Sequence, residues 1–138
     1  MKILCVIVLL TLVSMSNSIG FTRIQVRIMN RRGNGKSITI HCQSEDDDLG
    51  THVVSDGQEI NWSFRENFML TTRFYCYLQW DRKGKHFNFD AYSGKRDDGG
   101  RCSTECLWKI LEGGLWGYDQ EQQIWQAFSL PGMGEKEV

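Results

Sequence analysis

The sequence predicts an all-β fold, an antiparallel β-sandwich of about eight short strands with two disulfides. Runs of alternating apolar and polar residues recur along the chain, separated by turns rich in glycine, asparagine and aspartate, as in known sandwiches. The chain has a single proline, and no segment carries the 3.6-residue apolar period of an amphipathic helix. Four of the five cysteines follow the N-terminal leader, and an even number in an oxidising compartment predicts two disulfides.

The N-terminus has the composition of a secretory signal peptide. A single lysine precedes an apolar run over residues 3–13, which is shorter than the about 20 residues that span a bilayer. Small residues suit cleavage after Ser18, with cleavage before Phe21 as the alternative. We therefore expect a signal peptide over residues 1–18 and one domain over residues 19–138 that is not inserted in a membrane.

The first strands are expected on either side of a glycine-rich turn. Residues 22–28 alternate between apolar and polar side chains. Segment 30–35 follows, and its asparagines and glycines tolerate the positive φ angles of a turn. Residues 38–42 resume the alternation, so we expect these two strands to form a hairpin.

A second hairpin is expected around Asp56-Gly57, a dipeptide that favours two-residue turns. This turn joins a short strand at 52–55 to the alternating segment 58–64. The clearest strand of the chain is 71–80, in which Phe74, Cys76, Leu78 and Trp80 share one face with Thr72.

The last third of the chain predicts four more strands. Residues 87–92 continue the inward apolar pattern, and a polar, glycine-rich loop follows over residues 93–100. Short apolar segments at 106–110, 115–118 and 124–128 are separated by turns. No internal repeat or linker interrupts this pattern, which indicates a single domain.

The positions of the cysteines leave the pairing of the two disulfides open. Cys42, Cys76 and Cys106 share the phase of inward-facing apolar residues, whereas Cys102 lies in the loop before the strand at 106–110. A bridge from Cys102 to Cys106 would close a very small ring and leave the two sheets unlinked. We therefore expect Cys42 and Cys76 to pair separately with the other two cysteines, with Cys42 to Cys106 preferred.

Four local motifs span nearly all of the mature chain. They are His41-Cys42-x-Ser44-x-Asp46-Asp47-Asp48-Leu49-Gly50, Trp62-Ser63-Phe64, Phe74-Tyr75-Cys76 followed by Trp80, and Cys102-x-x-x-Cys106-x-Trp108. In these motifs the chain resembles the plant self-incompatibility S-protein homologue family. The resemblance implies a secreted plant β-sandwich with two disulfides. It also implies an extracellular ligand that a plasma-membrane receptor protein of plant cells recognises.

The charged loops are the expected partner-binding surfaces, because exposed loops often carry function. The acidic loop after Cys42 has two other interpretations, a plain turn built on Asx hydrogen bonds and a calcium site. The ligand spacing, central glycine and terminal glutamate of an EF-hand are missing from it, which disfavours calcium. The expected contact residues are Glu45, Asp46, Asp47, Asp48, Arg82, Lys83, Lys85, Lys95 and Arg96.

Asn61-Trp62-Ser63 is an N-glycosylation sequon. Trp62 belongs to the apolar face of its strand, so the period of two directs Asn61 towards solvent. We expect a glycan on Asn61 unless the folding strand hides the sequon first.

Aromatic residues offer an alternative function. Tyr75, Tyr77 and Trp116 are candidates for an exposed platform that stacks on sugar rings or anchors a protein partner, unless a neighbouring strand or sheet covers them. A secreted carbohydrate-binding protein, or a secreted defence protein or inhibitor, is therefore the alternative to a signalling ligand.

Composition and spacing disfavour catalysis, metal binding and nucleic acid. The formal net charge of −1 provides no basic surface for nucleic acid or anionic lipid. His41, His52 and His86 lack local ligand spacing, and no Gly-x-Ser-x-Gly motif occurs. Asp97 and Asp98 lie in a glycine-rich loop, where solvated carboxylates are more common than a glycosidase pair. We therefore expect a monomeric binding protein with no enzymatic activity, cofactor or metal.

Overall fold

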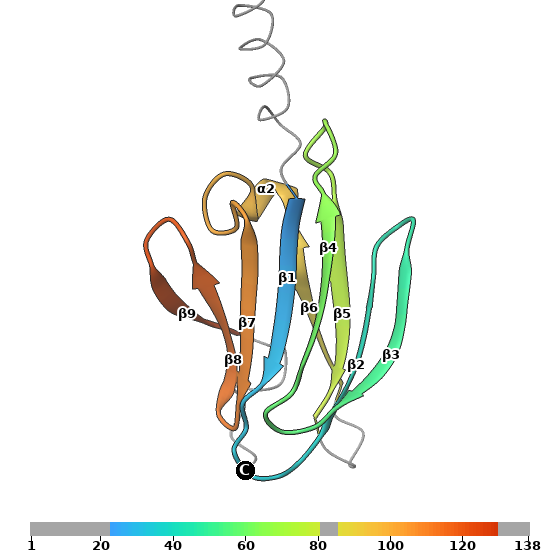
Figure 1. The fold of residues 1–138 in the computed structure, drawn as a ribbon, viewed down its shortest axis with the longest axis vertical. Coiled ribbons are helices and arrows are strands. Elements are labelled where there is room, and N and C mark those ends of the chain that lie inside the picture. Colours follow the sequence, from blue (N-terminus) through green and yellow to red (C-terminus); the bar gives the residue numbers. More distant parts are fainter. Residues whose placement is uncertain (1–22, 81–85, 130–138) are drawn as a thin grey trace, which may run out of the picture.

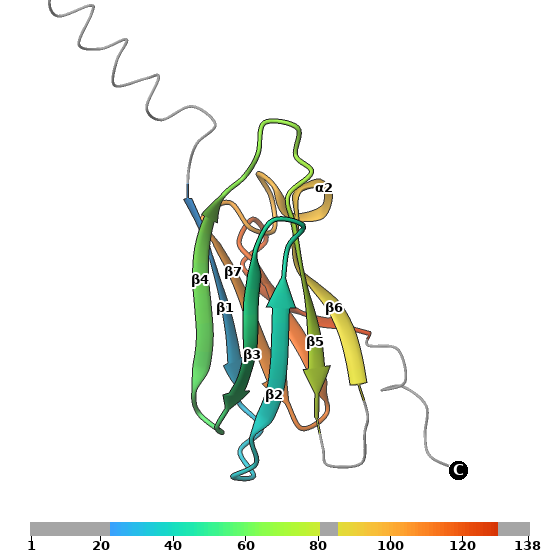
Figure 2. The ribbon, with the colours of Figure 1, turned by 90° about the vertical axis from the view of Figure 1, so that its right-hand side faces the viewer.

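The computed structural model describes residues 23–80 and 86–129, in which nine strands form two sheets packed face to face (Figure 1). The five-stranded sheet has the order β4-β1-β7-β8-β9. Its strands are β1 (Arg23–Asn30), β4 (Glu59–Arg65), β7 (Glu105–Leu111), β8 (Gly114–Asp119) and β9 (Ile124–Phe128). The four-stranded sheet has the order β3-β2-β5-β6 (Figure 2). Its strands are β2 (Ile38–Gln43), β3 (Asp48–Val54), β5 (Arg73–Gln79) and β6 (His86–Ser93), and the one-turn helix α2 (Gly94–Asp97) follows β6.

The predicted all-β sandwich is confirmed. In β1, β2 and β5 the alternation of apolar and polar residues becomes an alternation of buried and more exposed side chains. Neighbouring strands run antiparallel, except that β1 and β7 are parallel. This parallel pair joins the N-terminal strand to the last third of the chain in the middle of the five-stranded sheet.

Both predicted hairpins are wrong, because the chain changes sheet at each of the two turns. β1 and β4 lie in the five-stranded sheet, whereas β2 and β3 lie in the other. The second turn does form, and the Gln58 N–H donates to the Ser55 carbonyl at 2.9 Å. The Asp56 carboxylate ties the two crossings together, since it accepts hydrogen bonds from the Gly33 and Gly35 amides at 3.0 and 2.8 Å. The turn depends on local chemistry, whereas the choice of partner strand depends on packing across the whole domain.

The hydrophobic core lies between the sheets and includes the fully buried Trp108 of β7. Its ring packs against Phe89 of β6 and Phe128 of β9, with ring centres 5.2 and 4.8 Å apart. The Trp108 indole N–H donates to the Ala91 carbonyl of β6 at 2.9 Å. The same side chain therefore fills the core and connects the two sheets by a hydrogen bond.

The disulfides join Cys42 to Cys76 and Cys102 to Cys106, so the expected pairing was wrong. Cys42 and Cys76 face each other as partners on the neighbouring strands β2 and β5. Cys102 and Cys106 lie in the loop before β7 and near its start. The phase of the alternation correctly indicated buried cysteines, but it carries no information on which strands are neighbours. Among the described residues, core packing rather than a disulfide holds one sheet to the other.

Several predictions made from the sequence concern residues outside the described ranges. They are the signal peptide at 1–18 and the contact residues Arg82, Lys83 and Lys85. Within residues 23–80 and 86–129, no helix has the length and apolar character needed to cross a bilayer.

Candidate functional site

The acidic loop between β2 and β3 is exposed, as predicted. A tight turn shapes it, in which the Ser44 amide donates to the Asp47 carbonyl at 2.7 Å and the Asp47 amide donates to the Ser44 hydroxyl at 3.0 Å. The side chains of Glu45, Asp46 and Asp47 accept no hydrogen bond from any residue that the structure describes. Three carboxylates are therefore presented to solvent on an ordered turn.

Asp48 differs from these three neighbours because it is held by the protein. Its carboxylate accepts a hydrogen bond from the Gly50 amide at 2.9 Å and lies 2.5 Å from Nε2 of His41. The Gly50 amide, and to a lesser extent His41, hold the pKa of Asp48 below its usual range. Asp48 thus fixes the end of the acidic loop on β2, and a structural role accounts for it.

The acidic loop does not gather the ligands of a cation site. Within the described ranges, three metal-ligand side chains converge only at Asp97, Cys102 and Cys106, and these two cysteines are joined as a disulfide. No histidine of the described ranges belongs to such a group of three. A calcium site in the acidic loop therefore has no geometric support.

A feature missed in the sequence is an apolar tip on the loop between β4 and β5. Phe68, Met69 and Leu70 are 92%, 76% and 41% exposed. Figure 1 shows this loop at the same end of the sandwich as α2 and the loop between β2 and β3. Soluble proteins seldom expose neighbouring large apolar side chains without a partner to cover them. The sequence signal for this tip was the apolar run at 68–70, which no predicted strand includes.

Hydrogen bonds to two side chains hold the backbone of this loop. The buried Glu66 carboxylate accepts from the amides of Asn67 and Thr72 at 3.0 and 3.2 Å. The Asn67 side-chain oxygen accepts from the amides of Met69 and Thr71 at 3.1 and 2.9 Å. The Glu66 and Asn67 side chains thus hold the loop backbone, while its apolar side chains are exposed in a preorganised arrangement that limits the entropy lost on binding.

Helix α2 supports the same end of the molecule. The Gly94 amide donates to the Thr72 carbonyl at 3.0 Å. A Cβ atom at position 94 would lie 2.4 Å from the Leu70 carbonyl oxygen, so only glycine allows the loop to approach this closely. Both basic contact residues predicted here, Lys95 and Arg96, are exposed. Arg96 is occupied, since it donates to the Asp90 carbonyl at 2.7 Å and to Asp97.

Asp97 is fully buried, which corrects the expectation of a solvated carboxylate, whereas Asp98 is exposed. Asp97 accepts hydrogen bonds from the side chains of Arg96 and Arg101 at 2.6 and 2.8 Å, and from the Ser93 amide at 2.9 Å. Burial alone would raise the pKa of Asp97, but the hydrogen bonds and charges of the two arginines outweigh it and leave the pKa below its usual range.

Arg101 connects this carboxylate to the hydrophobic core. Its guanidinium lies 4.5 Å from the centre of the Trp108 ring, an arrangement that favours a cation–π interaction. Its Nη1 donates to the Tyr118 carbonyl of β8 at 3.4 Å. The loop that the sequence predicted as solvated therefore contains a buried ion pair between Asp97 and Arg101, which positions α2 on the sandwich.

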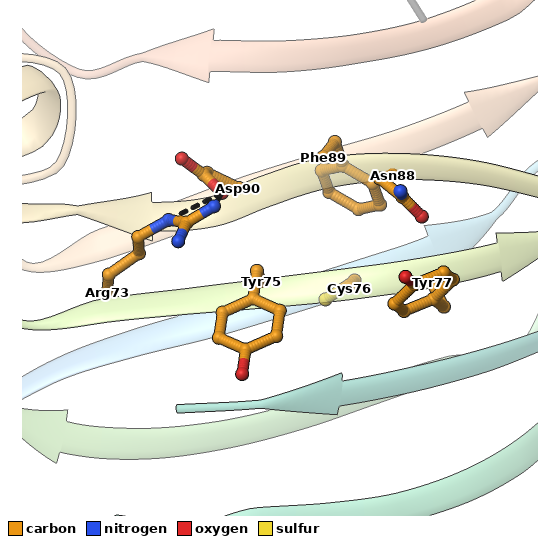
Figure 3. Close-up of a pocket in the computed structure, with 7 residues that line it drawn as sticks. All are labelled: Arg73, Tyr75, Cys76, Tyr77, Asn88, Phe89 and Asp90. Carbon is orange, nitrogen blue, oxygen red and sulfur yellow. Dashed lines mark hydrogen bonds and ion pairs between the residues drawn. The ribbon is translucent and has the colours of Figure 1, made fainter. Parts of the chain in front are cut away.

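A shallow pocket of about 430 Å³ lies on the outer face of the four-stranded sheet. Figure 3 shows Arg73, Tyr75 and Tyr77 of β5 beside Asn88 and Asp90 of β6. Tyr77 is exposed, as expected for an aromatic platform, whereas Tyr75 is partly buried. Trp116 is partly buried and belongs to β8 of the other sheet, so the three predicted aromatics do not form one platform.

The remaining predicted residues fall in two groups. Asn61 is exposed on β4, an edge strand of the five-stranded sheet, which is an open position for a glycan. The predicted contact residues Arg82, Lys83 and Lys85 lie outside the described residues.

Comparison with known sequences places the chain among plant proteins. Residues 25–129 match the family model described as plant self-incompatibility protein S1. The chain is similar to self-incompatibility protein S1 of Papaver rhoeas, with 56% identity over 130 residues that cover 94% of this chain and 93% of the relative. It is also similar to S-protein homolog 5 of Arabidopsis thaliana, with 40% identity over 94 residues that cover 68% and 70% of the two chains.

A solved structure shows the same fold. It is described as a self-incompatibility protein homologue from a widespread family of small, highly stable, secreted plant proteins. The TM-score is 0.60 with 17% sequence identity, and the match covers 80% of this chain and 98% of the solved one. The two-sheet arrangement is therefore common to chains whose sequences have diverged widely.

Proposed function

Because the chain belongs to the plant self-incompatibility S1 family of secreted proteins, we propose that it is a monomeric signalling ligand for a cell-surface receptor. The receptor contacts the loop end, defined here as the acidic loop at 44–47, the loop at 66–72 and helix α2. The message passes by contact rather than by catalysis.

The observation that carries the proposal is the exposed, preorganised apolar tip at the same end of the sandwich as an acidic turn. Binding interfaces draw most of their free energy from a few large side chains that fill partner pockets, surrounded by polar residues. Phe68 and Met69 have the size and exposure of such anchors. The free carboxylates of Glu45, Asp46 and Asp47 supply a polar rim that favours a basic surface on the partner.

The proposed contact surface includes only some of the contact residues that the sequence predicts. The free acidic residues and Lys95 stay in the proposed contact surface, whereas Asp48 and Arg96 are exposed but engaged by neighbouring groups of the protein. Arg82, Lys83 and Lys85 remain predicted contacts. We also propose that Asn61 carries a glycan, which mass measurement of the secreted protein before and after deglycosylation would detect.

The test is saturable binding of the labelled mature protein to intact plant cells. Phe68→Ser should weaken binding by about tenfold or more, because an anchor contributes at least about 1.4 kcal/mol. Val53→Ser is the matched control, since Val53 is 71% exposed but lies on β3, outside the loop end. Equal binding of Phe68→Ser and the wild type would remove the apolar tip from the contact surface. Absence of saturable binding to any plant cell type would overturn the receptor proposal itself.

A further inference from the structure

The outer face of the four-stranded sheet carries two rows of side chains across β2, β5 and β6. In the first row, the strand register places Tyr77 between His41 of β2 and Asn88 of β6. The second row places Tyr75 between Gln43 and Asp90. Side chains directly opposite each other on antiparallel strands lie about 5 Å apart. The two tyrosines therefore stand at the centre of a compact polar surface.

The Cys42–Cys76 disulfide lies beneath this face and holds its two central strands together. Cys76 falls between Tyr75 and Tyr77 on β5, and Cys42 is its partner on β2. Both cysteines point into the core, because alternate residues of a strand face opposite ways. The covalent link fixes the register of β2 against β5, so the rows above it are preorganised for a ligand.

The surface presents an exposed aromatic ring, together with polar groups that form no hydrogen bond to the described residues. Tyr77 is 50% exposed. Among residues 23–80 and 86–129, the hydroxyls of Tyr75 and Tyr77 and the side-chain amides of Gln43 and Asn88 have no hydrogen-bond partner. A ligand that presents hydroxyl groups would find donors and acceptors on both sides of the rings.

The charges of the pocket cancel each other. Arg73 donates from Nε to the Asp90 carboxylate at 3.0 Å, and its Nη2 lies 2.9 Å from the same oxygen. The Arg73 guanidinium also lies 5.0 Å from the centre of the Tyr75 ring, which leaves Tyr77 as the more accessible stacking surface (Figure 3). A phosphate or sulfate would need a free cation here, so the paired charges favour a neutral ligand.

From this arrangement we propose that the outer face of β2, β5 and β6 binds a short neutral oligosaccharide. A sugar ring has a face of C–H groups and a rim of hydroxyls, and the pocket matches both. The C–H face packs on the Tyr77 ring, whose flat apolar surface covers area at low entropic cost. The hydroxyls bond Asn88, Gln43 and the carboxylate of Asp90, and the volume of about 430 Å³ is in the range of small-molecule sites.

The proposal concerns a surface separate from the loop end, so the two are testable independently. The mature protein would be screened on an array of neutral oligosaccharides that includes cello-, xylo- and manno-oligosaccharides. Positive probes would then be titrated by calorimetry. We expect at least one of them to bind at one site per chain.

Three variants identify the site. Tyr77→Ala should weaken oligosaccharide binding by about tenfold or more, whereas Tyr77→Phe should retain most of it because the ring face remains. Val53→Ala, on the same sheet face but outside the pocket, and Phe68→Ser at the loop end should bind as the wild type does. Thermal unfolding of each variant would establish that it is folded. Binding of no neutral oligosaccharide at millimolar concentration, or equal binding by a folded Tyr77→Ala, would overturn the proposal.

Discussion

A buried carboxylate is stable in a folded protein only when cations and hydrogen bonds replace the water that it has lost. Asp97 meets this condition through Arg96, Arg101 and the Ser93 amide. Its neighbour Asp98 is exposed. Two adjacent aspartates thus have different roles, because one side chain points into the protein and the other into solvent. The glycine-rich sequence around them is shared and does not reveal this difference.

The first prediction is that Asp97→Asn lowers the free energy of unfolding by about 3–5 kcal/mol, because it leaves the nearly buried guanidinium of Arg101 without its counter-charge. Asp98→Asn is the matched control and should change the free energy by less than about 0.5 kcal/mol. Urea unfolding of the two variants measures both values. Similar stabilities for the two variants would show that the ionic cluster does not stabilise the fold.

The second prediction concerns pH. The pKa of Asp97 is lower in the folded protein than the value of about 3.9 in an unfolded chain. Its ionised form therefore stabilises the fold fully above that unfolded value, and the stabilisation is lost as pH falls through the folded pKa. The stability gap between wild type and Asp97→Asn should be constant near neutral pH and shrink below about pH 4. A gap that stays constant down to pH 2 would be inconsistent with this mechanism.

At the scale of elements, the loop at 66–72 and α2 form one unit that displays the apolar tip. Gly94 lies so near the Leu70 backbone that a Cβ at position 94 would clash with it. Leu70 itself adopts a positive φ of 56°, which is uncommon for a residue with a side chain. Contacts from α2 and from Glu66 hold the loop in this conformation.

The third prediction is that Gly94→Ala loosens this unit, because a methyl group at position 94 would overlap the Leu70 carbonyl. The expected cost is about 1–3 kcal/mol of stability, with faster hydrogen exchange at the Met69 and Thr71 amides. Gly113→Ala is the control, since a Cβ there meets no atom within 4 Å. Unchanged exchange in Gly94→Ala would mean that α2 does not order the loop.

Local sequence patterns predict some features of the fold, whereas features that depend on contacts between distant segments of the chain cannot be predicted from them. The alternation in β1, β2 and β5 is local, and it predicted their positions and buried faces. The pairing of β1 with β7 and the sheet changes after β1 and β3 depend on segments far apart in the chain, so no local pattern reveals them. The exposed tip at 68–70 and the buried Asp97 were missed for the same reason, since burial depends on neighbours from other elements.

At the scale of the whole molecule, neither disulfide connects the two sheets, which are joined by the hydrophobic core between them. One bridge spans 34 residues along the chain and the other spans 4. A longer closed loop restricts the unfolded chain more. Packing around Trp108, together with the Asp97 cluster, carries the contact between layers.

The fourth prediction is that the two bridges stabilise the protein unequally. Chain entropy assigns about 4 kcal/mol to Cys42–Cys76 and about 2 kcal/mol to Cys102–Cys106. The double variants Cys42→Ala/Cys76→Ala and Cys102→Ala/Cys106→Ala should therefore both lose stability, the first by more than the second. Chemical denaturation compares them, and the reverse order would indicate that the small ring stabilises the Asp97 cluster directly.

The central claim is that a receptor contacts the apolar tip of the loop end. Site-specific photo-cross-linking on intact plant cells tests it most directly, with a photoreactive phenylalanine at position 68 and, as control, at position 53. We predict one discrete protein adduct from position 68, which excess unlabelled protein abolishes, and no such adduct from position 53. Cross-links from position 68 to lipid alone, or the same adducts from both positions, would contradict the account.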